Sequence, residues 1–369
     1  MTPEGSQATA ARDGGLVEQI EATLADYLAL RRLDAAGVHP CFADAADVLT
    51  RFVLDGGKRI RPTFAWWGWR GAGGDPGGAD TGAVLRAISA LELVQACALV
   101  HDDLMDHSDT RRGNPTVHVE FAGRHRRDRW EGPSENYGAA AAILLGDLAL
   151  AWADDMLDES GMTEVQRSRV RPVWAAMRTE VLGGQFLDSW SQASGDASVE
   201  AAMRVNRFKT AAYTVERPLQ LGAALAGAPA GLIEAYGGFG ADVGVAFQLR
   251  DDLLGVFGDP GVTGKPAGDD LREGKRTLLV ALAFEAAHRA GRAADIDLLT
   301  AALGNRDLDA TTLGRVREVL HGLGAVAEVE QRIERLTASG LAALAAAEVC
   351  PPADSALIEL AHAATRRRY

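Results

Sequence analysis

Four aspartates gather between Val100 and His118, in the stretch VHDDLMDHSDTRRGNPTVH. Asp102 and Asp106 are four residues apart, so both carboxylates project from one face of a helix. Like charges at this spacing cost about 0.2–0.5 kcal/mol unless a cation neutralises them. Mg²⁺ prefers oxygen ligands, takes one or two protein carboxylates and completes its shell with water and phosphate oxygens. The spacing is compatible with a metal site, although on spacing alone an acidic helix end facing water is the simpler interpretation.

The surroundings of these aspartates distinguish them from a second acidic run. Asp154 to Asp158, in DDMLD, repeats the same spacing, so the pattern alone does not locate a metal. Only the first cluster is followed at once by two arginines, Arg111 and Arg112. Planar guanidinium groups bind phosphate oxygens in pairs, and carboxylates that hold a metal beside them suit a diphosphate. The context therefore favours the stretch around Asp102 as the metal site.

Two further segments carry charge next to apolar helical sequence. Asp251 and Asp252 follow Phe247 and Gln248 in FQLRDDLLGVFGD, which gives another acidic helix face. Lys209 lies inside the apolar segment NRFKTAAYT, where a lysine either extends to water or faces a polar cavity. On its own, extension to water is the simpler interpretation of Lys209.

Basic residues also lie in two glycine-rich segments. GGKRIRP places Lys58, Arg59 and Arg61 at a turn that leads into a helix. Free backbone N–H groups at the helix start add to their charge, which makes an anion pocket possible, although exposed basic turns are common. Lys265 and Lys275 flank the loop TGKPAGDDLREGKRT, which is rich in glycine and charge. We expect a surface loop there, or a lid that folds over a ligand.

Length and composition predict an all-α fold. The chain has 369 residues, of which 47% are apolar, 24% are charged and only 6% are aromatic. Alanine and leucine abound, and runs typical of strands are hard to find. Apolar residues recur at helical spacing from Leu16 to Leu33 and near Ala43 to Leu54. Further helices are expected near residues 62–70, 81–106, 137–158, 163–192, 198–226, 231–257, 275–290, 295–303, 310–322, 325–347 and 353–366.

The breaks between these helices are short, and none resembles a linker between domains. They lie at residues 71–78, 124–136, 258–268 and 351–352. Many long helices with short joints indicate one helical bundle. We therefore expect a single domain over residues 15–369, preceded by a disordered amino-terminal tail over residues 1–14.

The charge balance and the cysteines restrict partners and compartment. A formal net charge of −13 argues against non-specific binding to nucleic acid or to an anionic membrane. Three widely spaced cysteines, Cys41, Cys97 and Cys350, favour a reducing cytoplasm over a disulfide framework. The most apolar long window, Tyr137 to Leu157, is interrupted by aspartates, so we expect a buried helix there and no membrane span.

With these residues assembled, the sequence resembles the trans-isoprenyl diphosphate synthases of the polyprenyl synthetase family, most of all the bacterial geranylgeranyl diphosphate synthases. Six motifs between about residues 50 and 280 follow the family's order: GGKRIRP, LVHDDLMDHSDTRRGNPTVH, GGQFLD, FKTAAYT, FQLRDDLLG and GKPAGDDLREGKRT. Six ordered motifs are far more specific than any one of them. The resemblance implies a helical bundle of the isoprenoid synthase type with a deep central cavity, usually a homodimer, that condenses isopentenyl diphosphate with an allylic diphosphate.

By this resemblance, three Mg²⁺ ions would surround the diphosphate of the allylic substrate. Their ligands would be Asp102, Asp106 and Asp251, with Asp103 and Asp252 in supporting positions. Metal ions and nearby cations would stabilise the departing diphosphate, so that the allylic C–O bond ionises. The double bond of isopentenyl diphosphate would then attack the cation and a proton would be lost, which requires no protein nucleophile.

The resemblance divides the other polar residues between the two diphosphates. Those implied at the allylic diphosphate are Arg111, Lys209 and Lys275, and Lys265 is a further candidate for binding substrate. Those implied at isopentenyl diphosphate are Lys58, Arg61 and Arg112, with Gln95 in the place of a histidine, and Arg59 is a further candidate for binding substrate. Gln248 and the backbone near Thr210 would face the developing carbocation.

Two positions depart from the family's pattern. Gly255 stands where the second acidic motif usually ends in aspartate, and Asp259 is too distant in sequence to replace it. Gln95 occupies a place where many relatives carry a histidine for isopentenyl diphosphate. An amide still forms a hydrogen bond with a phosphate, so we infer at most weaker binding of that substrate.

Small residues before the first aspartate bear on product length. A helix rises about 1.5 Å per residue, which puts Ala98 and Cys97 roughly 6 to 8 Å below Asp102. Relatives that stop at fifteen carbons typically place aromatic side chains at this depth. The small residues here predict geranylgeranyl diphosphate, with farnesyl diphosphate or a longer polyprenyl diphosphate as alternatives. In another interpretation, Cys97 and Ala98 merely pack against a neighbouring helix.

Two rival functions share part of this pattern. A class I terpene cyclase also uses Mg²⁺ and ionisation, but it holds no isopentenyl diphosphate, and the intact Lys58, Arg61 and Arg112 argue against it. A regulatory subunit without catalysis would have lost metal ligands. Both aspartate pairs are retained, although Gly255 keeps this alternative open.

Overall fold

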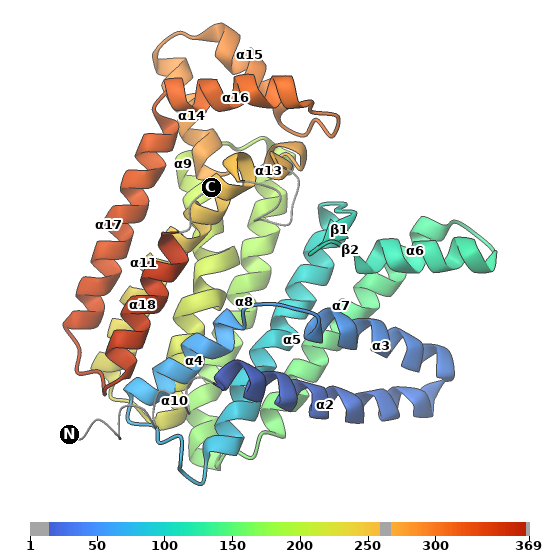
Figure 1. Ribbon diagram of the computed structural model, residues 1–369, viewed down its shortest axis with the longest axis vertical. Helices are drawn as coiled ribbons and strands as arrows, with labels where there is room; N and C mark the ends of the chain where they lie inside the picture. Colours follow the sequence, from blue (N-terminus) through green and yellow to red (C-terminus); the bar gives the residue numbers. More distant parts are fainter. Residues whose placement is uncertain (1–14, 259–266, 367–369) are drawn as a thin grey trace. The chain divides into compact units, whose positions relative to one another are not determined.

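The computed structural model describes residues 15–258 and 267–366. These residues are almost entirely helical, which confirms the predicted all-α fold (Figure 1). The predicted tail, residues 1–14, lies outside the described residues, as does Lys265.

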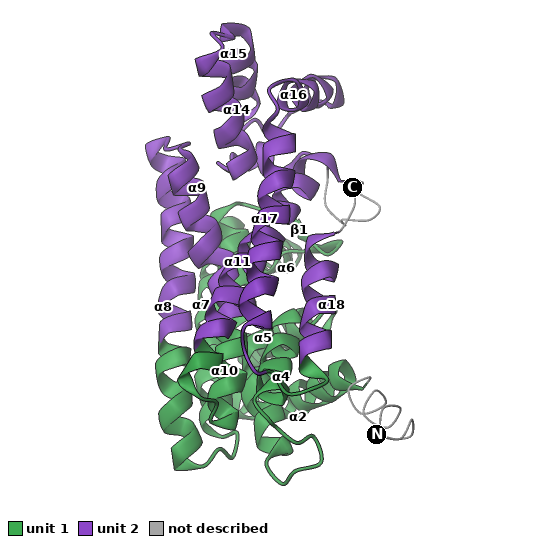
Figure 2. Cartoon of the chain, turned by 90° about the vertical axis from the view of Figure 1, so that its left-hand side faces the viewer, with its two compact units in different colours: residues 1–175, 217–233, 349–353 green, residues 176–216, 234–348, 354–369 purple. Residues whose placement is uncertain are grey.

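The chain divides into two compact units, drawn in different colours in Figure 2. The first unit comprises residues 1–175, 217–233 and 349–353, and the second comprises residues 176–216, 234–348 and 354–369. Each unit has its own set of packed helices. A single domain over residues 15–369 stays a prediction.

The first unit is built around α5, the helix that carries the first acidic cluster. Its other elements include α2 (Leu16–Val38), α3 (Pro40–Leu54), α4 (Ile60–Gly71), α6 (Val117–Asp128), α7 (Ser134–Asp158), α10 (Arg217–Ala226) and the beginning of α8 (Glu164–Ser194). α5 (Thr81–Met105) is apolar around most of its circumference, so it is buried among its neighbours, and α7 runs along it (Figure 1). Its carboxyl end carries Asp102 and Asp103 and remains accessible only in part.

Among the described residues, α5 is the one helix long and apolar enough to cross a membrane. Its most apolar window has a mean hydropathy of 1.8, and 72% of that window is buried inside the protein. A buried core helix meets the same test of length and composition. The sequence analysis instead takes Tyr137 to Leu157, which forms most of α7, as the most apolar long window.

The second unit contains the end of α8, most of α11 (Ala230–Phe257) and the helices that follow it. Its further elements are α9 (Val199–Val205), the π-helix η1 (Asn206–Glu216), α13 (Asp269–Arg272), α14 (Leu278–Arg289), α15 (Ala293–Ala302), α16 (Ala310–Gly322), α17 (Ala325–Ala345) and α18 (Ala353–Thr365). Leu249, Leu253 and Leu278 are fully buried in its core. Ser198 and Thr277 cap α9 and α14, because each side chain accepts a hydrogen bond from a backbone N–H three residues later.

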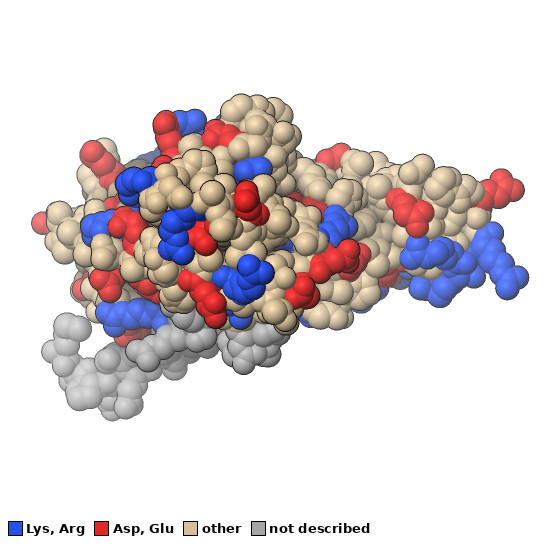
Figure 3. All heavy atoms as spheres, turned by 90° about the horizontal axis from the view of Figure 1, so that it is seen from above, with Lys and Arg blue, Asp and Glu red and all other residues tan. Residues whose placement is uncertain are grey.

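Three features differ from the elements expected from sequence. Residues 117–128 form α6, whereas the sequence predicted a break over residues 124–136. The pattern does not reveal this helix because only a narrow apolar strip with Phe121 and His125 is buried there. Its exposed arginines gather at the outer end of the helix (Figure 3). The helix expected over 198–226 changes to a π-helix from Asn206 to Glu216. A short antiparallel hairpin, β1 (Thr110–Arg111) with β2 (Asn114–Pro115), follows α5.

Glycine at position 222 sets how closely α10 approaches α4. A β-carbon there would lie 1.9 Å from the Ala65 carbonyl oxygen, a backbone atom that cannot rotate away. We expect Gly222→Ala to push the helices apart and to lower the free energy of unfolding by about 1–3 kcal/mol, measured by urea denaturation.

Gly231→Ala is the matched control. Gly231 is exposed in the first turn of α11, and nothing lies within 4 Å of its added β-carbon. Because alanine favours the helix by about 0.5–1 kcal/mol, this change should leave stability unchanged or raise it slightly. Equal destabilisation by both substitutions would contradict the packing argument.

Candidate functional site

The first acidic cluster lies at the carboxyl end of α5. His107 adopts the left-handed conformation, with φ 54°, and the helix closes with hydrogen bonds from His107 N–H to Leu104 and from Ser108 N–H to Asp103. This Schellman closure stops the helix directly after Asp106. Asp102 and Asp106 therefore lie one turn apart at the negative end of the helix dipole, where a cation is favoured.

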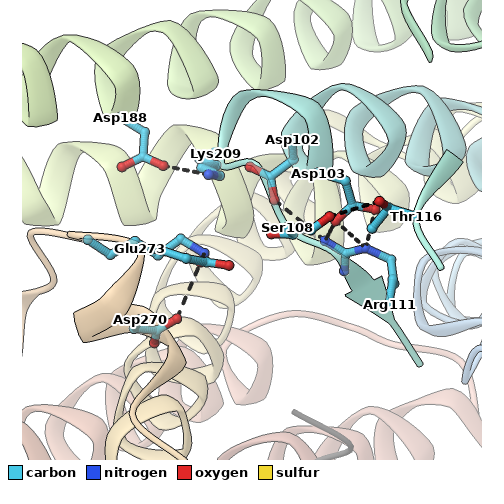
Figure 4. A network of polar contacts seen from close by, with 10 residues as sticks. Asp102, Asp103, Ser108, Arg111, Thr116, Asp188, Lys209, Asp270 and Glu273 are labelled. Atoms are coloured by element: carbon cyan, nitrogen blue, oxygen red, sulfur yellow. Dashed lines mark hydrogen bonds and ion pairs between the residues drawn. The ribbon is translucent and has the colours of Figure 1, made fainter. Parts of the chain in front are cut away.

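Asp103 has a different task from its neighbour Asp102. Its side chain is only 1% exposed and accepts three close hydrogen bonds from Arg111, at 2.6 to 2.8 Å (Figure 4). The Arg111 guanidinium is also 3.7 Å from Asp102 Oδ2. Two-point contact fixes the plane of the guanidinium. Asp103 thus orients Arg111 beside Asp102.

The β1–β2 hairpin separates the two consecutive arginines. Arg112 and Gly113 form its two-residue turn, with φ of 53° and 78°, and Thr116 Oγ1 donates a 2.8 Å hydrogen bond to the Ser108 carbonyl. Arg111 is held toward Asp103 from the strand. Arg112 instead donates to the carbonyls of Asp55 and Gly56, at 3.2 and 2.9 Å. The hairpin therefore directs neighbouring side chains to separate places.

A small hollow on the first unit brings together three residues predicted to bind substrate. Arg59, Gln95 and Arg112 line it, together with Phe52 and Glu92. Partial burial lowers the pKa of Arg112, and repulsion from Arg111 lowers it further. Positive charge is therefore concentrated here, which favours an anion. Lys58 is exposed and Arg61 is buried, and neither is among the residues that line the hollow.

Arg59 is engaged within the protein. Its side chain is 1% exposed and forms a 2.9 Å ion pair with Glu92, which is also buried. It donates further hydrogen bonds to the Val53 and Leu54 carbonyls, at 2.9 and 3.2 Å. These contacts tie the start of α4 to α5 and to the end of α3. They favour a structural task for Arg59 over direct contact with a substrate.

Lys209, in the second unit, pairs with Asp188 on α8. The Nζ to Oδ2 distance is 2.5 Å, and the two side chains are 20% and 11% exposed (Figure 4). Gly184 lets α8 approach the π-helix, because a β-carbon there would lie 2.2 Å from the Lys209 backbone nitrogen. π-Helical segments are frequent at functional sites, since they reorient side chains. Lys209 therefore has a polar partner instead of simply extending to water.

A chain of hydrogen bonds links η1 to the second acidic motif. Thr210 Oγ1 donates to Gln248 Oε1, and Gln248 Nε2 donates to Asp252 Oδ1, both at 2.7 Å. Burial and, to a lesser extent, repulsion from the neighbouring Asp270 carboxylate raise the pKa of Asp252 to about 8. Asp251 is half-buried on the same helix. Gln248 is thus held between a hydroxyl and a buried carboxyl group.

Lys275 lies among acidic side chains of the second unit. Its Nζ is 2.5 Å from Glu273 Oε2 and 3.8 Å from Asp270 Oδ1. Asp270 and Glu273 belong to the segment that contains α13 (Figure 4). Sequence reasoning overlooked both acids, although GDDLREGKRT places Asp270 five residues and Glu273 two residues before Lys275.

The two small residues before the first aspartate lie on different faces of α5. Cys97 is buried, and its sulfur is 3.8 Å from His101 Nδ1. His101 Nε2 lies 3.1 Å from the Ile143 carbonyl on α7, so this face packs against α7. Ala98 is half-buried and one turn before Asp102. The contacts favour the packing interpretation for Cys97 and leave Ala98 on the face of Asp102.

Comparison with known proteins identifies the family. The sequence profile of the polyprenyl synthetases matches residues 44–318. The chain belongs to the polyprenyl synthetase family.

Relatives of this family resemble the chain in both sequence and structure. The geranylgeranyl pyrophosphate synthase of Corynebacterium glutamicum, crystallised with isoprenyl diphosphate and magnesium, matches with a TM-score of 0.92 and 46% identity over 96% of this chain and 99% of that one. The geranylfarnesyl diphosphate synthase of Aeropyrum pernix is 36% identical over 75% of this chain and 79% of its own length. The farnesyl diphosphate synthase of Mycobacterium tuberculosis is 37% identical over 64% of this chain and 59% of its own length.

These relatives confirm the predicted class, a trans-prenyltransferase of the polyprenyl diphosphate synthase type. The family depends on Mg²⁺, as expected from the sequence. The names of the relatives range from farnesyl to geranylfarnesyl products, so they do not decide the length made by this polyprenyl synthetase.

The donor atoms in this polyprenyl synthetase suit Mg²⁺. Among the described residues, no three His, Cys, Asp or Glu side chains are already grouped as a complete metal site. Pairs of carboxylates on α5 and α11 instead leave coordination positions for water and phosphate oxygens, as Mg²⁺ requires. Asp252 Oδ2 is buried, and no donor among the described residues reaches it, so a nearby cation would stabilise it.

Carboxylates of the second acidic run, Asp154 to Asp158, contact side chains elsewhere in the protein. Asp154 accepts a 2.6 Å hydrogen bond from the Trp174 indole, and Asp158 forms an ion pair with Arg167. These contacts give both carboxylates a structural explanation.

The raised pKa of Asp252 predicts how stability depends on pH when Mg²⁺ is removed. Below about pH 4 both the folded and the unfolded protein hold this proton. Between about pH 4 and the folded pKa of about 8, the unfolded chain releases the proton and the folded protein keeps it, so stability falls as pH rises. Asp252→Asn stays neutral throughout.

In EDTA, the Tm of Asp252→Asn minus that of the unchanged protein should therefore increase from pH 5 to pH 8.5. Thermal unfolding followed by circular dichroism measures this difference. A difference independent of pH would show that Asp252 is ionised in the fold.

Proposed function

We propose that this polyprenyl synthetase condenses isopentenyl diphosphate with an allylic diphosphate and releases geranylgeranyl diphosphate as its main product. The observation that carries the proposal is the arrangement at the end of α5. Asp102 and Asp106 lie one turn apart, and Asp103 holds Arg111 beside Asp102. A metal-bridged diphosphate needs this combination of oxygen ligands and a planar cation.

Three Mg²⁺ ions would bind with the allylic diphosphate, held by Asp102, Asp106 and Asp251. The family's dependence on magnesium and the spacing of the aspartates support this assignment. Bound Mg²⁺ supplies charge stabilisation for the departing diphosphate. Arg111 adds a guanidinium whose orientation is fixed by Asp103. Lys209 and Lys275 would contribute further positive charge toward the same diphosphate.

Isopentenyl diphosphate would bind at the first unit through Lys58, Arg61 and Arg112, with Gln95 donating from its amide. The hollow that includes Gln95 and Arg112 supports this assignment. Arg59 is left out of the set, because its guanidinium already pairs with Glu92 and backbone carbonyls.

The chemistry would proceed by ionisation, condensation and elimination. The allylic C–O bond breaks and the diphosphate leaves with the electron pair. The double bond of isopentenyl diphosphate then attacks the allylic carbon, and the released diphosphate accepts the proton. Oxygens of Thr210 and Gln248, held by their mutual hydrogen bond, would face the cation and stabilise it.

Geranylgeranyl diphosphate is the product that the α5 side chains favour. Ala98 lies one turn before Asp102 and is too small to stop a growing chain at fifteen carbons. The similarity in sequence and structure to the Corynebacterium glutamicum enzyme supports the same length.

A homodimer in the cytoplasm is part of the proposal. Ile143 and Leu144 on α7 are 48% and 65% exposed. Exposure of two neighbouring apolar side chains to water is costly, and contact with a second copy of the chain would bury them. The three cysteines, two of them exposed and none in a disulfide, fit a reducing compartment.

Incubation with Mg²⁺, isopentenyl diphosphate and dimethylallyl, geranyl or farnesyl diphosphate tests the reaction, with products sized by chromatography. We expect Asp102→Ala to lower kcat by about 10²- to 10³-fold or more, because it removes charge that the transition state needs. Asp155→Ala, in the exposed second acidic run, is the control and should retain activity. A cyclic hydrocarbon from an allylic substrate alone would favour the cyclase instead.

Substitutions on the two faces of α5 test the product length. Ala98→Phe should shift the product from twenty to fifteen carbons, because an aromatic ring one turn below Asp102 blocks elongation. Cys97→Phe should instead lower the free energy of unfolding by about 1–3 kcal/mol, because the ring has no room against α7. Product analysis and urea denaturation distinguish the two. A shorter product from Cys97→Phe alone would reverse the assignment of the faces.

A further inference from the structure

The second acidic motif of this chain ends in glycine, and the structure places a carboxylate from elsewhere at that position. Gly255 lies four residues after Asp251, on the same face of α11. Asp270, in the first turn of α13, puts its Oδ2 atom 1.9 Å from the point where a β-carbon of residue 255 would lie. Glycine leaves room for the Asp270 carboxylate, which a β-carbon at residue 255 would displace.

Several contacts hold Asp270 against α11. The Gly268 N–H donates a 3.0 Å hydrogen bond to the Gly255 carbonyl, which joins the start of α13 to α11. The Lys275 N–H donates to the Asp270 carbonyl at 2.9 Å, and the Lys275 Nζ is 3.8 Å from Asp270 Oδ1. The backbone on both sides of Asp270 is therefore anchored, and its carboxylate is kept beside Gly255.

The adjoining carboxylate points to a cation at this place. Asp252 is 4% exposed, and its Oδ1 accepts the hydrogen bond from Gln248. Its Oδ2 is buried, and within residues 15–258 and 267–366 no donor reaches it. Burying a carboxyl oxygen without a polar partner is costly, and a divalent ion bound by neighbouring oxygens removes that cost.

We propose that Asp270 supplies the carboxylate that the second acidic motif lacks at Gly255, and that with Asp251 it positions a divalent cation on the diphosphate. The pair reproduces in space the one-turn separation that Asp102 and Asp106 have on a single helix. Glycine at position 255 is then a requirement of the site and not the loss of a ligand. The inference rests on the proposed function, since it concerns the metal and the diphosphate of that reaction.

Binding of inorganic diphosphate to the full-length protein at increasing Mg²⁺ concentration tests the inference without turnover. Isothermal titration calorimetry gives the Mg²⁺ concentration at half-saturation. Asp270→Asn should raise that concentration about 10- to 100-fold, the usual effect of losing a group that orients metal ligands. Asp269→Asn removes the same charge one residue earlier and should leave the concentration unchanged.

Two substitutions at position 255 separate geometry from charge. Gly255→Ala keeps every carboxylate but displaces Asp270, so it should also raise the Mg²⁺ concentration required. Asp270→Ala combined with Gly255→Asp moves the carboxylate onto α11, where it no longer meets Asp270. The double variant should need less Mg²⁺ than Asp270→Ala alone. Circular dichroism without Mg²⁺ verifies that each variant is folded.

An unchanged Mg²⁺ requirement in folded Asp270→Asn and Gly255→Ala overturns the inference and gives Asp270 a purely structural role. In that case, product formation by the unchanged protein and its loss in Asp102→Ala would leave the proposed function intact. If the unchanged protein neither binds diphosphate with Mg²⁺ nor forms product, the proposed function fails, and this inference fails with it.

Discussion

Crowded negative charge that needs cations is the constraint on which the rest of this structure depends. Asp102 and Asp106 lie at the negative end of α5, and Asp251 and Asp252 lie near the end of α11. Arg111 neutralises part of the first group through Asp103. In the second group, Asp252 keeps an oxygen that receives no donor among the described residues. Such charge is tolerated where a metal and a phosphate ligand complete it.

Neighbouring residues of the same type have separate tasks in this fold. The Asp102 side chain is partly exposed to solvent, whereas the Asp103 side chain is buried against Arg111. Arg111 lies in a strand and Arg112 in the turn, so their side chains reach different partners. The hairpin, only two residues to a strand, therefore directs the two side chains of one basic pair to different partners.

The positions that depart from the family's pattern have physical explanations in the structure. Gly255 makes room for Asp270, a carboxylate from another helix. Gln95 lines the hollow with Arg59 and Arg112, where an amide can still meet a phosphate. A missing residue type in a motif therefore does not by itself indicate a missing function, since another element can bring the same chemical group to that place.

The sequence by itself determined the helices and the chemical class of the site. Apolar residues at helical spacing depend only on local pattern, so α5, α7 and α11 could be predicted nearly to their ends. Ordered motifs likewise identified the family. α6 and the π-helix were not predicted, because α6 buries only a narrow strip and the π-helix depends on how closely α8 approaches Lys209.

Tertiary structure decided the partners of each site residue. Residues 33 apart in the chain, Arg59 and Glu92, form a buried pair that no local pattern reveals. The same holds for Lys209 with Asp188 and for Asp270 with Gly255. Charge and spacing are properties of a segment, but a contact distance depends on which helices pack together, and only the folded chain specifies that.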